Sequence, residues 1–250
     1  MMLEGQVAVV TGGSSGIGRA TAVAFAREGA SVVIGDINEA GAQETLDGIA
    51  QAGGIGSFEP TDVGDADQVQ RLVNRAVERF GALHVMFNNA GTGEYAPLLE
   101  HTIEQYQRVI RVNQDGVFYG IVAAARRMRE LGIKGTIVNT SSVFGYLASP
   151  GVIGYHASKA AVRMLSQAAA LELAPFGIRV VCIAPGTTDT PIIQGYKDFG
   201  LEPTMARSQM RGRILKPEQI AEVVVWLCSP GADAINGSVV MADDGFASFK

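Results

Sequence analysis

A serine, a tyrosine and a lysine near the middle of the chain have the types and spacing needed for proton transfer. Tyr155 and Lys159 are four residues apart, so they share one face if this segment is helical. Ser142 lies 13 residues before Tyr155, at the end of an apolar segment that reads as a strand. A phenol beside an ammonium can give or take a proton, and the hydroxyl can hold the group that the proton moves to or from. The three residues therefore predict general acid–base chemistry.

A glycine-rich turn near the N-terminus has the form expected of a phosphate site. Residues 11–18 read Thr-Gly-Gly-Ser-Ser-Gly-Ile-Gly, after a strand and at the start of a helix. Such a turn lets a pyrophosphate approach a helix N-terminus, whose free N–H groups and dipole favour anions. Asp36 ends the next strand, 18 residues after Gly18, near the offset of a carboxylate that binds a ribose 2′-hydroxyl. Because that carboxylate would repel a 2′-phosphate, and Ser15 and Ile37 supply no cation, the pattern predicts NAD.

The segments that must position these residues alternate between β-branched runs and helical patterns. Apolar residues over 69–80 recur at helical spacing, Asp65 caps that helix and Gly81 ends it. Strands this apolar are typical of parallel sheets buried on both faces. The alternation predicts an α/β fold, a doubly wound parallel seven-stranded sheet with helices on both faces. The expected strands are 7–11, 31–35, 55–58, 83–87, 136–139, 179–183 and 238–241, and the other expected helices are 16–28, 40–50, 102–128 and 155–174.

The composition describes one well-packed domain. No break divides the 250 residues, of which 47% are hydrophobic and 18% charged, so residues 1–250 are predicted to form a single domain. Residues 187–215 mix Pro, Gly, Met and Arg without a clear period, and a loop of that length is usually functional; we expect a substrate-binding lid.

Charge, cysteine content and hydropathy exclude several classes of partner. A net charge of −5 provides no basic footprint, so nucleic acid is not expected. Cys182 and Cys228 lie far apart in apolar runs and read as reduced core residues, with no disulfide and no metal site. The chain starts without the pattern of a signal peptide and has no apolar run of membrane-spanning length. We expect a cytoplasmic protein with no membrane partner.

Further motifs extend this pattern over nearly the whole chain. They are Thr11-Gly12-x-x-x-Gly16-x-Gly18, Asn88-Asn89-Ala90-Gly91, Asn113, Ser142, Tyr155-x-x-x-Lys159 and Pro185-Gly186-x-x-x-Thr190. A Tyr-x-x-x-Lys pair alone occurs by chance in many proteins, but the set in this order is specific. The chain resembles the short-chain dehydrogenase/reductases of roughly 250 residues, which implies a Rossmann fold. It also implies an NAD-dependent oxidoreductase that interconverts a secondary alcohol and a ketone.

The resemblance assigns roles to the central residues. Tyr155 is the general acid/base, and Lys159 lowers the pKa of Tyr155 and holds the nicotinamide ribose. Ser142 orients the substrate oxygen and is chosen over Ser141 because the family's spacing to the tyrosine is usually 13. Asn113 supports a water relay to the lysine. His156 points about 100° away from Tyr155 on the helix, so we expect it at the surface or an interface.

The resemblance also implies where the cofactor and substrate bind. Residues 88–91, which follow the fourth strand, line the adenosine part of the cofactor. Thr190 holds the nicotinamide carboxamide. The residues expected to bind NAD are Gly12, Ser14, Ser15, Gly16, Ile17, Gly18, Asp36, Ile37, Asp62, Val63, Asn89, Ala90, Gly91, Tyr155, Lys159, Pro185, Gly186, Thr188 and Thr190. The residues expected to contact substrate are Glu94, Ser142, Phe144, Tyr155 and Tyr196. This mostly apolar set favours a ring or medium-chain substrate. Because the lid also contains arginines, an anionic substrate remains an alternative.

Two departures and two alternative functions accompany the resemblance. His84 stands where the family often has Asp, and Asp243-Asp244-Gly245 replaces the usual Asp-Gly-Gly, which could alter a subunit interface or the pocket rim. The alternatives are an epimerase or dehydratase that uses NAD transiently, and a non-catalytic nucleotide-binding sensor. The resemblance implies a homotetramer in which the helices at about 103–128 and 155–174 pair across a two-fold axis. Small residues at 123–125 and 168–170 would permit their close approach.

Overall fold

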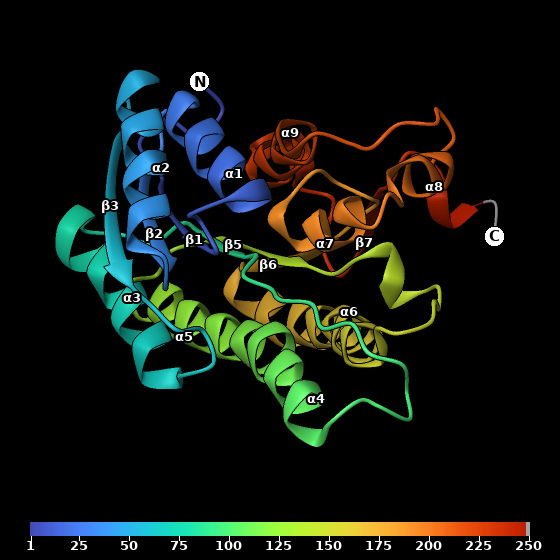
Figure 1. The fold of residues 1–250 in the computed structure, drawn as a ribbon. Coiled ribbons are helices and arrows are strands. Elements are labelled where there is room, and N and C mark those ends of the chain that lie inside the picture. The colour runs from blue at the N-terminus through green and yellow to red at the C-terminus, as the bar shows by residue number, and fades with distance from the viewer. Residues whose placement is uncertain (249–250) are drawn as a thin grey trace.

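The computed structural model describes residues 1–248 and contains one parallel sheet between two layers of helices (Figure 1). The strand order is β3-β2-β1-β4-β5-β6-β7, so the direction of winding reverses between β1 and β4. This confirms the predicted doubly wound seven-stranded sheet, and a crevice at such a reversal is where ligands bind in these folds. The strands are β1 (Val7–Thr11), β2 (Ser31–Asp36), β3 (Ile55–Pro60), β4 (Val85–Asn88), β5 (Thr136–Thr140), β6 (Arg179–Pro185) and β7 (Val239–Ala242).

Helices α1, α2 and α9 cover one face of the sheet, and α3, α5 and α6 cover the other (Figure 1). In the part of the chain that the structure describes, no helix combines the length and the apolar character that crossing a membrane requires. The helices are α1 (Gly16–Arg27), α2 (Glu39–Gln51), α3 (Ala66–Phe80), α4 (Ile103–Ile110), α5 (Gly116–Glu130), α6 (Ile153–Leu173), α7 (Gln194–Asp198), α8 (Glu202–Arg207) and α9 (Pro217–Cys228).

Strand β1 explains why the sheet supports a core on each face. Successive side chains of a strand point to opposite faces. Val7 and Val9 belong to the core beneath α3, α5 and α6, whereas Ala8 and Val10 belong to the core beneath α1, α2 and α9. An uninterrupted apolar sequence is therefore needed, and all five residues of β1 are buried.

A buried chain of polar side chains fixes α6 against the sheet. Asn88 Nδ2 donates to Asn139 Oδ1 at 2.8 Å, and Asn139 Nδ2 donates to Ser166 Oγ at 2.9 Å. Ser166 Oγ in turn donates to the Val162 carbonyl of α6 at 2.7 Å. Gly120 of α5 makes room for this chain, because a Cβ there would lie 1.9 Å from Asn88 Oδ1. Directional hydrogen bonds thus join β4, β5 and α6 inside the core.

The helix expected over 102–128 is interrupted at Asn113. Its start is as predicted, with Thr102 and Gln105 forming a capping box. Residues Arg111–Asp115 then form a π-helical turn that separates α4 from α5. Such single-turn bulges inside helices are frequent at functional sites. The apolar spacing of the sequence did not show it.

Helix α9 was not expected from the sequence. It covers the sheet beside α1, and Ile220, Val224 and Val225 are buried against that face. Its signals were present: Pro217 occupies the first helical turn, and the Gln219 side chain accepts from the backbone N–H of residue 216 at 3.0 Å.

The segment expected to be an irregular lid contains two short helices, α7 and α8. The two ends of this segment lie side by side, beyond the carboxyl end of β6. Leu215 N donates to the Thr187 carbonyl at 2.9 Å, and Asp189 N donates to the Leu215 carbonyl at 2.8 Å. The lid is therefore a loop closed at its base, with α7 and α8 projecting beyond (Figure 1).

Candidate active site

Ser142, Tyr155 and Lys159 meet at the carboxyl end of β5. Tyr155 and Lys159 lie on successive turns of α6, and the Lys159 Nζ is 5.5 Å from the centroid of the Tyr155 ring. Ser142 follows β5, and its hydroxyl lies close enough to the Tyr155 phenol to act on the pKa of that group. The neighbouring Ser141 instead donates to the Lys159 carbonyl at 2.7 Å, which makes it a structural residue. The structure thus brings together the three residues that the sequence singled out.

The electrostatics of this group are dominated by burial. Desolvation raises the pKa of the Tyr155 phenol, although the hydrogen bond with Ser142 acts to lower it. Desolvation lowers the pKa of Lys159 to about 8, because its side chain is almost fully buried. The ammonium donates to the Thr140 carbonyl at 2.8 Å. The fall in the Tyr155 pKa that the resemblance implies is therefore not a property of these protein groups alone.

Asn113 lies in the π-helical turn, fully buried, and faces the loop after β4. Its Oδ1 accepts from Thr92 N at 2.8 Å, and its Nδ2 donates to the Thr92 carbonyl at 2.9 Å. A further bond of 3.2 Å runs from Nδ2 to Ser158 Oγ on α6. A Cβ on Gly91 would lie 3.4 Å from Asn113 Oδ1 and 3.6 Å from Lys159 Nζ, so these groups converge.

The glycine-rich turn packs directly against the loop after β4. Gly12 has a φ of +67°, and a Cβ there would lie 2.7 Å from the Cα of Ala90. A Cβ on Gly18 would lie 2.0 Å from the Gly12 carbonyl. Thr11 Oγ1 accepts from the backbone N–H of Asn89 at 3.0 Å. Glycine is required at both positions, and the resulting cradle lies where β1 and β4 diverge.

Asp36 lies beside this cradle at the end of β2. Its Oδ2 accepts from Ser14 N at 3.0 Å and its Oδ1 from Asn38 N at 3.0 Å. Arg19, which was not among the residues expected at the cofactor, donates from Nε to the Ser14 carbonyl at 3.1 Å. Arg19 is also paired with Glu44 at 2.8 Å, so its charge is already matched. Its position directly after Gly18, in the first turn of α1, was the signal for this cation.

The remaining residues expected at the cofactor lie along the same edge of the sheet. Ile37 follows β2 and is 80% exposed, as a contact surface for a planar base would be. Asp62 follows β3, where its carboxylate pairs with Arg111 at 2.8 Å, and the buried Val63 lies beneath Gly116. After β6 the expected positions are Pro185, Gly186, Thr188 and Thr190, and in the turn they are Ser14, Ser15, Gly16 and Ile17. These positions share the edge of the sheet at which a doubly wound fold is expected to bind a dinucleotide.

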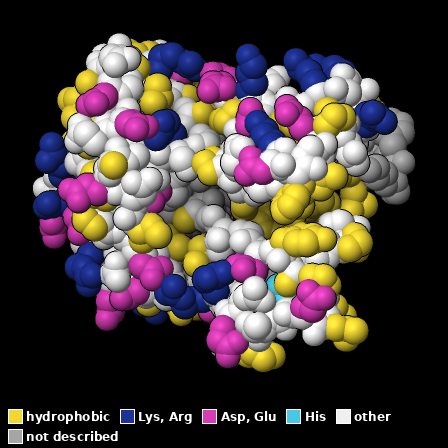
Figure 2. Space-filling view, viewed as in Figure 1, with side chains coloured by type: hydrophobic (Ala, Val, Ile, Leu, Met, Phe, Trp, Pro, Cys, Tyr) yellow, Lys and Arg dark blue, Asp and Glu magenta, His cyan; other side chains and the backbone are white. Residues whose placement is uncertain are grey.

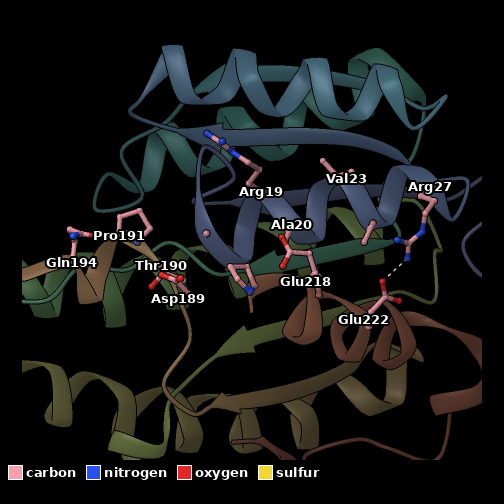
Figure 3. A pocket seen from close by; sticks show the side chains of 14 residues that line it. Arg19, Ala20, Val23, Arg27, Asp189, Thr190, Pro191, Gln194, Glu218 and Glu222 are labelled. Carbon is pink, nitrogen blue, oxygen red and sulfur yellow. Dashed lines mark hydrogen bonds and ion pairs between the residues drawn. The ribbon is translucent and has the colours of Figure 1, made fainter. Parts of the chain in front are cut away.

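A groove of about 540 Å³ runs between α1 and α9 (Figure 3). Gly16 and Thr190 line it where the phosphate turn meets the lid, and at its far end Arg27 pairs with Glu222 of α9 at 2.7 Å. Tyr155 is not among its lining residues. The groove is therefore adjacent to the cofactor cradle and separate from the acid–base group.

Aromatic rings surround the Tyr155 phenol. Phe144 meets the Tyr155 ring edge-on with centroids 6.5 Å apart, and Phe246 meets Phe144 in the same way at 6.1 Å. Tyr196 of the lid lies close enough to contribute to the raised pKa of Tyr155, and it packs on Tyr95 at 6.2 Å. Phe246 was missed from the sequence because it lies about 90 residues after Tyr155. Hydrophobic side chains gather in the hollow beneath α7 and α8 (Figure 2).

The Glu94 side chain is bound to residues of α4. Its carboxylate pairs with Arg108, and Gln105 Nε2 donates to it at 3.2 Å. These bonds fasten the loop after β4 to α4. A carboxylate can accept further hydrogen bonds beside these, so the expected contact of Glu94 with substrate stays a prediction.

His156 and His84 both make hydrogen bonds within the fold, and a role of the half-buried His156 at the surface or an interface stays a prediction. The His156 ring bridges the two ends of the loop after β5: Nε2 accepts from Ser149 N at 2.9 Å, and Nδ1 donates to the Phe144 carbonyl at 2.8 Å. A helical-wheel argument could not foresee that this loop returns over the helix. His84 Nδ1 accepts from the β1 amide of Val7 at 3.0 Å, so this departure from the family pattern has a structural role.

Comparison with known proteins identifies the family. A sequence model of the family described as "Enoyl-(Acyl carrier protein) reductase" matches residues 12–247. The chain is 41% identical to a cis-4-hydroxycyclohexanecarboxylate dehydrogenase of Sinomonas cyclohexanicum over 97% of each chain. It is 38% identical to a cyclohexanol dehydrogenase of Acinetobacter sp. (strain SE19), covering 97% of this chain and 95% of that one.

The fold agrees with a solved structure of the same kind. A short-chain type dehydrogenase/reductase from Mycobacterium marinum superposes with a TM-score of 0.94 at 33% identity, over 98% of this chain and 96% of that chain. Sequence and fold thus agree along nearly the full length. The chain belongs to the short-chain dehydrogenase/reductase family.

Proposed function

We propose that this protein is an NAD-dependent oxidoreductase that interconverts a secondary alcohol and a ketone on an apolar or cyclic substrate. The relatives named above support the coarser statement, an oxidoreductase that acts on alcohol groups. The observation that carries the proposal is the meeting of Ser142, Tyr155 and Lys159 beside the cradle that Asp36 borders.

The acid–base chemistry belongs to three side chains. Tyr155, as phenolate, takes the proton of the substrate hydroxyl, and Ser142 holds the substrate oxygen by a hydrogen bond throughout. A phenol with a pKa of about 10 needs roughly 4 kcal/mol of differential stabilisation to reach a pKa near 7, and burial of Tyr155 adds to that requirement. The Lys159 ammonium supplies part of it. When bound, NAD⁺ supplies the hydride acceptor and a positive charge near the phenol.

The preference for NAD rests on Asp36. Its carboxylate lies beside the Ser14 amide, where it can accept a hydrogen bond from a ribose 2′-hydroxyl and would repel a 2′-phosphate. Arg19 is the cation near this site, and its pairing with Glu44 leaves the repulsion in place. NADP is the alternative that the test below distinguishes.

An apolar or cyclic substrate is supported by the surroundings of Tyr155. Phe144 and Tyr196 border the phenol, and hydrophobic side chains line the hollow beneath the lid (Figure 2). The two relatives are named for cyclohexane alcohols, one of which carries a carboxylate. A ring alcohol therefore fits this chain best, with or without an anionic group.

A homotetramer in the cytoplasm remains our expectation for the assembly. Of the small residues expected at the paired surface, Ala123 and Ala124 are buried in the core, whereas Ala125, Ala168 and Ala169 line a groove between α5 and α6. Exposed apolar residues of α5 and α6 also support a paired surface; they include Phe118 at 48%, Met164 at 64% and Leu171 at 81% exposed. A dimer-disrupting Leu171→Glu change would test this surface by light scattering.

The proposal is tested by a panel of cyclic, aliphatic, polyol and acidic alcohols, each with NAD⁺ and with NADP⁺. Turnover of cyclohexanols with one NADH formed per alcohol would support it. Turnover of polyols alone, or a preference for NADP⁺, would contradict the substrate class or the role of Asp36. Product without net NADH would indicate an epimerase or dehydratase. Tight NAD binding without any turnover would indicate a sensor.

A further inference from the structure

Asp244 has a left-handed backbone conformation, which is uncommon among non-glycine residues although Asp adopts it more readily than most. Its φ is +49°, and within residues 1–248 it is the one non-glycine residue with a positive φ. Such strain persists only where the surrounding contacts require it, and it often marks functional positions. The turn that contains Asp244 follows β7, at the end of the described chain.

The neighbouring Asp243 already stabilises this turn. Its Oδ1 accepts from Gly245 N at 3.1 Å, and its Oδ2 accepts from Ala247 N at 2.8 Å. The carboxylate of Asp244 takes no part in these bonds. The strained position therefore needs another explanation than the local turn.

The Asp244 carboxylate is directed at the lid. Its Oδ2 accepts from Arg211 N at 3.1 Å, and its Oδ1 accepts from Arg211 Nε at 2.5 Å. The Asp244 carbonyl accepts from Met210 N at 2.9 Å. The Asp244 side chain is only 6% exposed, whereas Arg211 is 62% exposed. The carboxylate is thus a fixed acceptor to which an exposed arginine of the lid binds.

The charges around Asp244 favour this contact. Burial acts to raise the pKa of Asp244, but the hydrogen bonds from Arg211 and the charges of Arg211 and Arg213 lower it below the ordinary value of 3.8. The carboxylate is therefore ionised at neutral pH, as a charge-assisted bond requires.

A second set of hydrogen bonds, made by Gln209, lies close to the Arg211 contact in the lid. Gln209 is buried, and its Nε2 donates to the Thr187 carbonyl at 3.1 Å and to the Arg213 carbonyl at 2.5 Å. These bonds close the base of the lid on itself. The Arg211 contact instead joins the lid to another part of the chain, and it can open without disturbing the base.

The turn at Asp244 leads directly to the aromatic rings of the active site. Phe246 packs edge-on against Phe144, which packs edge-on against Tyr155. Met210 lies over Gly245, where a Cβ would be 2.6 Å from the Met210 Sδ. A displacement of the lid at Arg211 would therefore loosen the wall of the hollow that holds the substrate.

We propose that Asp244 is a positioning residue that holds the C-terminal end of the lid over the substrate hollow through Arg211. It contacts neither the acid–base group nor the cofactor cradle, so it acts on the Michaelis constant for the alcohol more than on kcat. This effect on substrate rests on the proposed function, whereas the effect on the lid does not.

The test compares Asp244→Asn, which keeps the shape and removes the charge, with Asp244→Gly, which also relieves the positive φ, and with Arg211→Gln. Glu222→Gln is the matched control, because it removes an exposed ion pair with Arg27 far from the lid. Hydrogen exchange of the amides of residues 194–207 is measured in the full-length protein without substrate. KM and kcat are then measured with NAD⁺ and cyclohexanol.

All three variants are expected to speed hydrogen exchange in the lid by about 5- to 30-fold, because each weakens one charge-assisted hydrogen bond. The control should leave the exchange rate unchanged. KM should rise by a similar factor with kcat altered less than about 2-fold. Unchanged exchange in all three variants, or a loss in kcat at constant KM, would overturn the proposal. If exchange rises but no alcohol is turned over even by the wild type, the contact of Asp244 with the lid is supported and the proposed function is wrong.

Discussion

Replacing Lys159 with methionine should abolish catalysis and stabilise the fold. Burial lowers the pKa of Lys159 from 10.5 to about 8, so at pH 7 the folded state holds an ammonium at a cost of roughly 3 kcal/mol relative to the unfolded chain. Methionine has a similar shape and no charge. It leaves the Thr140 carbonyl without its donor, which costs about 1 kcal/mol. The net gain is about 2 kcal/mol, or a rise in Tm of about 4–8 °C.

The sign of this gain depends on pH. Below about pH 8 the lysine is protonated in both states, and the full cost of burial is present. Between about pH 8 and 10.5 the folded state is neutral while the unfolded chain still binds the proton, so wild-type stability rises with pH. Above pH 10.5 both states are neutral, and the variant should lose its advantage.

Urea unfolding of wild type, Lys159→Met and the exposed-site control Lys134→Met at pH 7 and pH 10.5 measures this difference. The control should match the wild type at both values, because Lys134 is exposed. If Lys159→Met were less stable than the wild type at pH 7, the ammonium would be stabilised by the fold, and the burial argument would be wrong.

Three further changes test other parts of the structure. Tyr155→Phe should lower kcat by about 10²- to 10⁴-fold with NAD binding and Tm unchanged; near-normal turnover would refute the acid–base role. Asp36→Asn should weaken NAD⁺ binding by about 10-fold and improve the use of NADP⁺, measured as the ratio of kcat/KM values; an unchanged ratio would refute that assignment. Gly120→Ala should cost about 3 kcal/mol because its Cβ would overlap Asn88, whereas Gly195→Ala, in open space, should be neutral in urea unfolding. Equal stabilities would show that α5 can shift.

The sequence predicted the parts of the fold that depend on local periodicity. The strands are continuous apolar runs, and α3 has both its cap at Asp65 and its stop at Gly81. Helix α9 escaped notice because its buried side chains form clusters that resemble a strand as much as a helix. The π-helical turn at Asn113 was also missed, because it depends on hydrogen bonds to a loop 21 residues away.

In the candidate site, too, the residues related by local spacing were predicted and the contacts between distant segments were not. Ser142, Tyr155 and Lys159 could be placed from spacing along one strand and one helix. The bond of Glu94 to α4, the bridge made by His156 and the ring of Phe246 involve segments that meet only in the folded chain. The raised pKa of Tyr155 likewise depends on burial, which no spacing reports.

The polar chain that joins Asn88, Asn139 and Ser166 has a consequence for how the protein folds. Apolar helices can slide on a sheet by one turn at little cost, because one methyl group replaces another. Here such a slip of α6 would leave buried amide and hydroxyl groups unpaired, at about 1–3 kcal/mol for each. The misaligned forms are thereby made rare relative to the native one. The same helix carries Tyr155 and Lys159, so selection of its register during folding also determines which chains emerge competent for proton transfer.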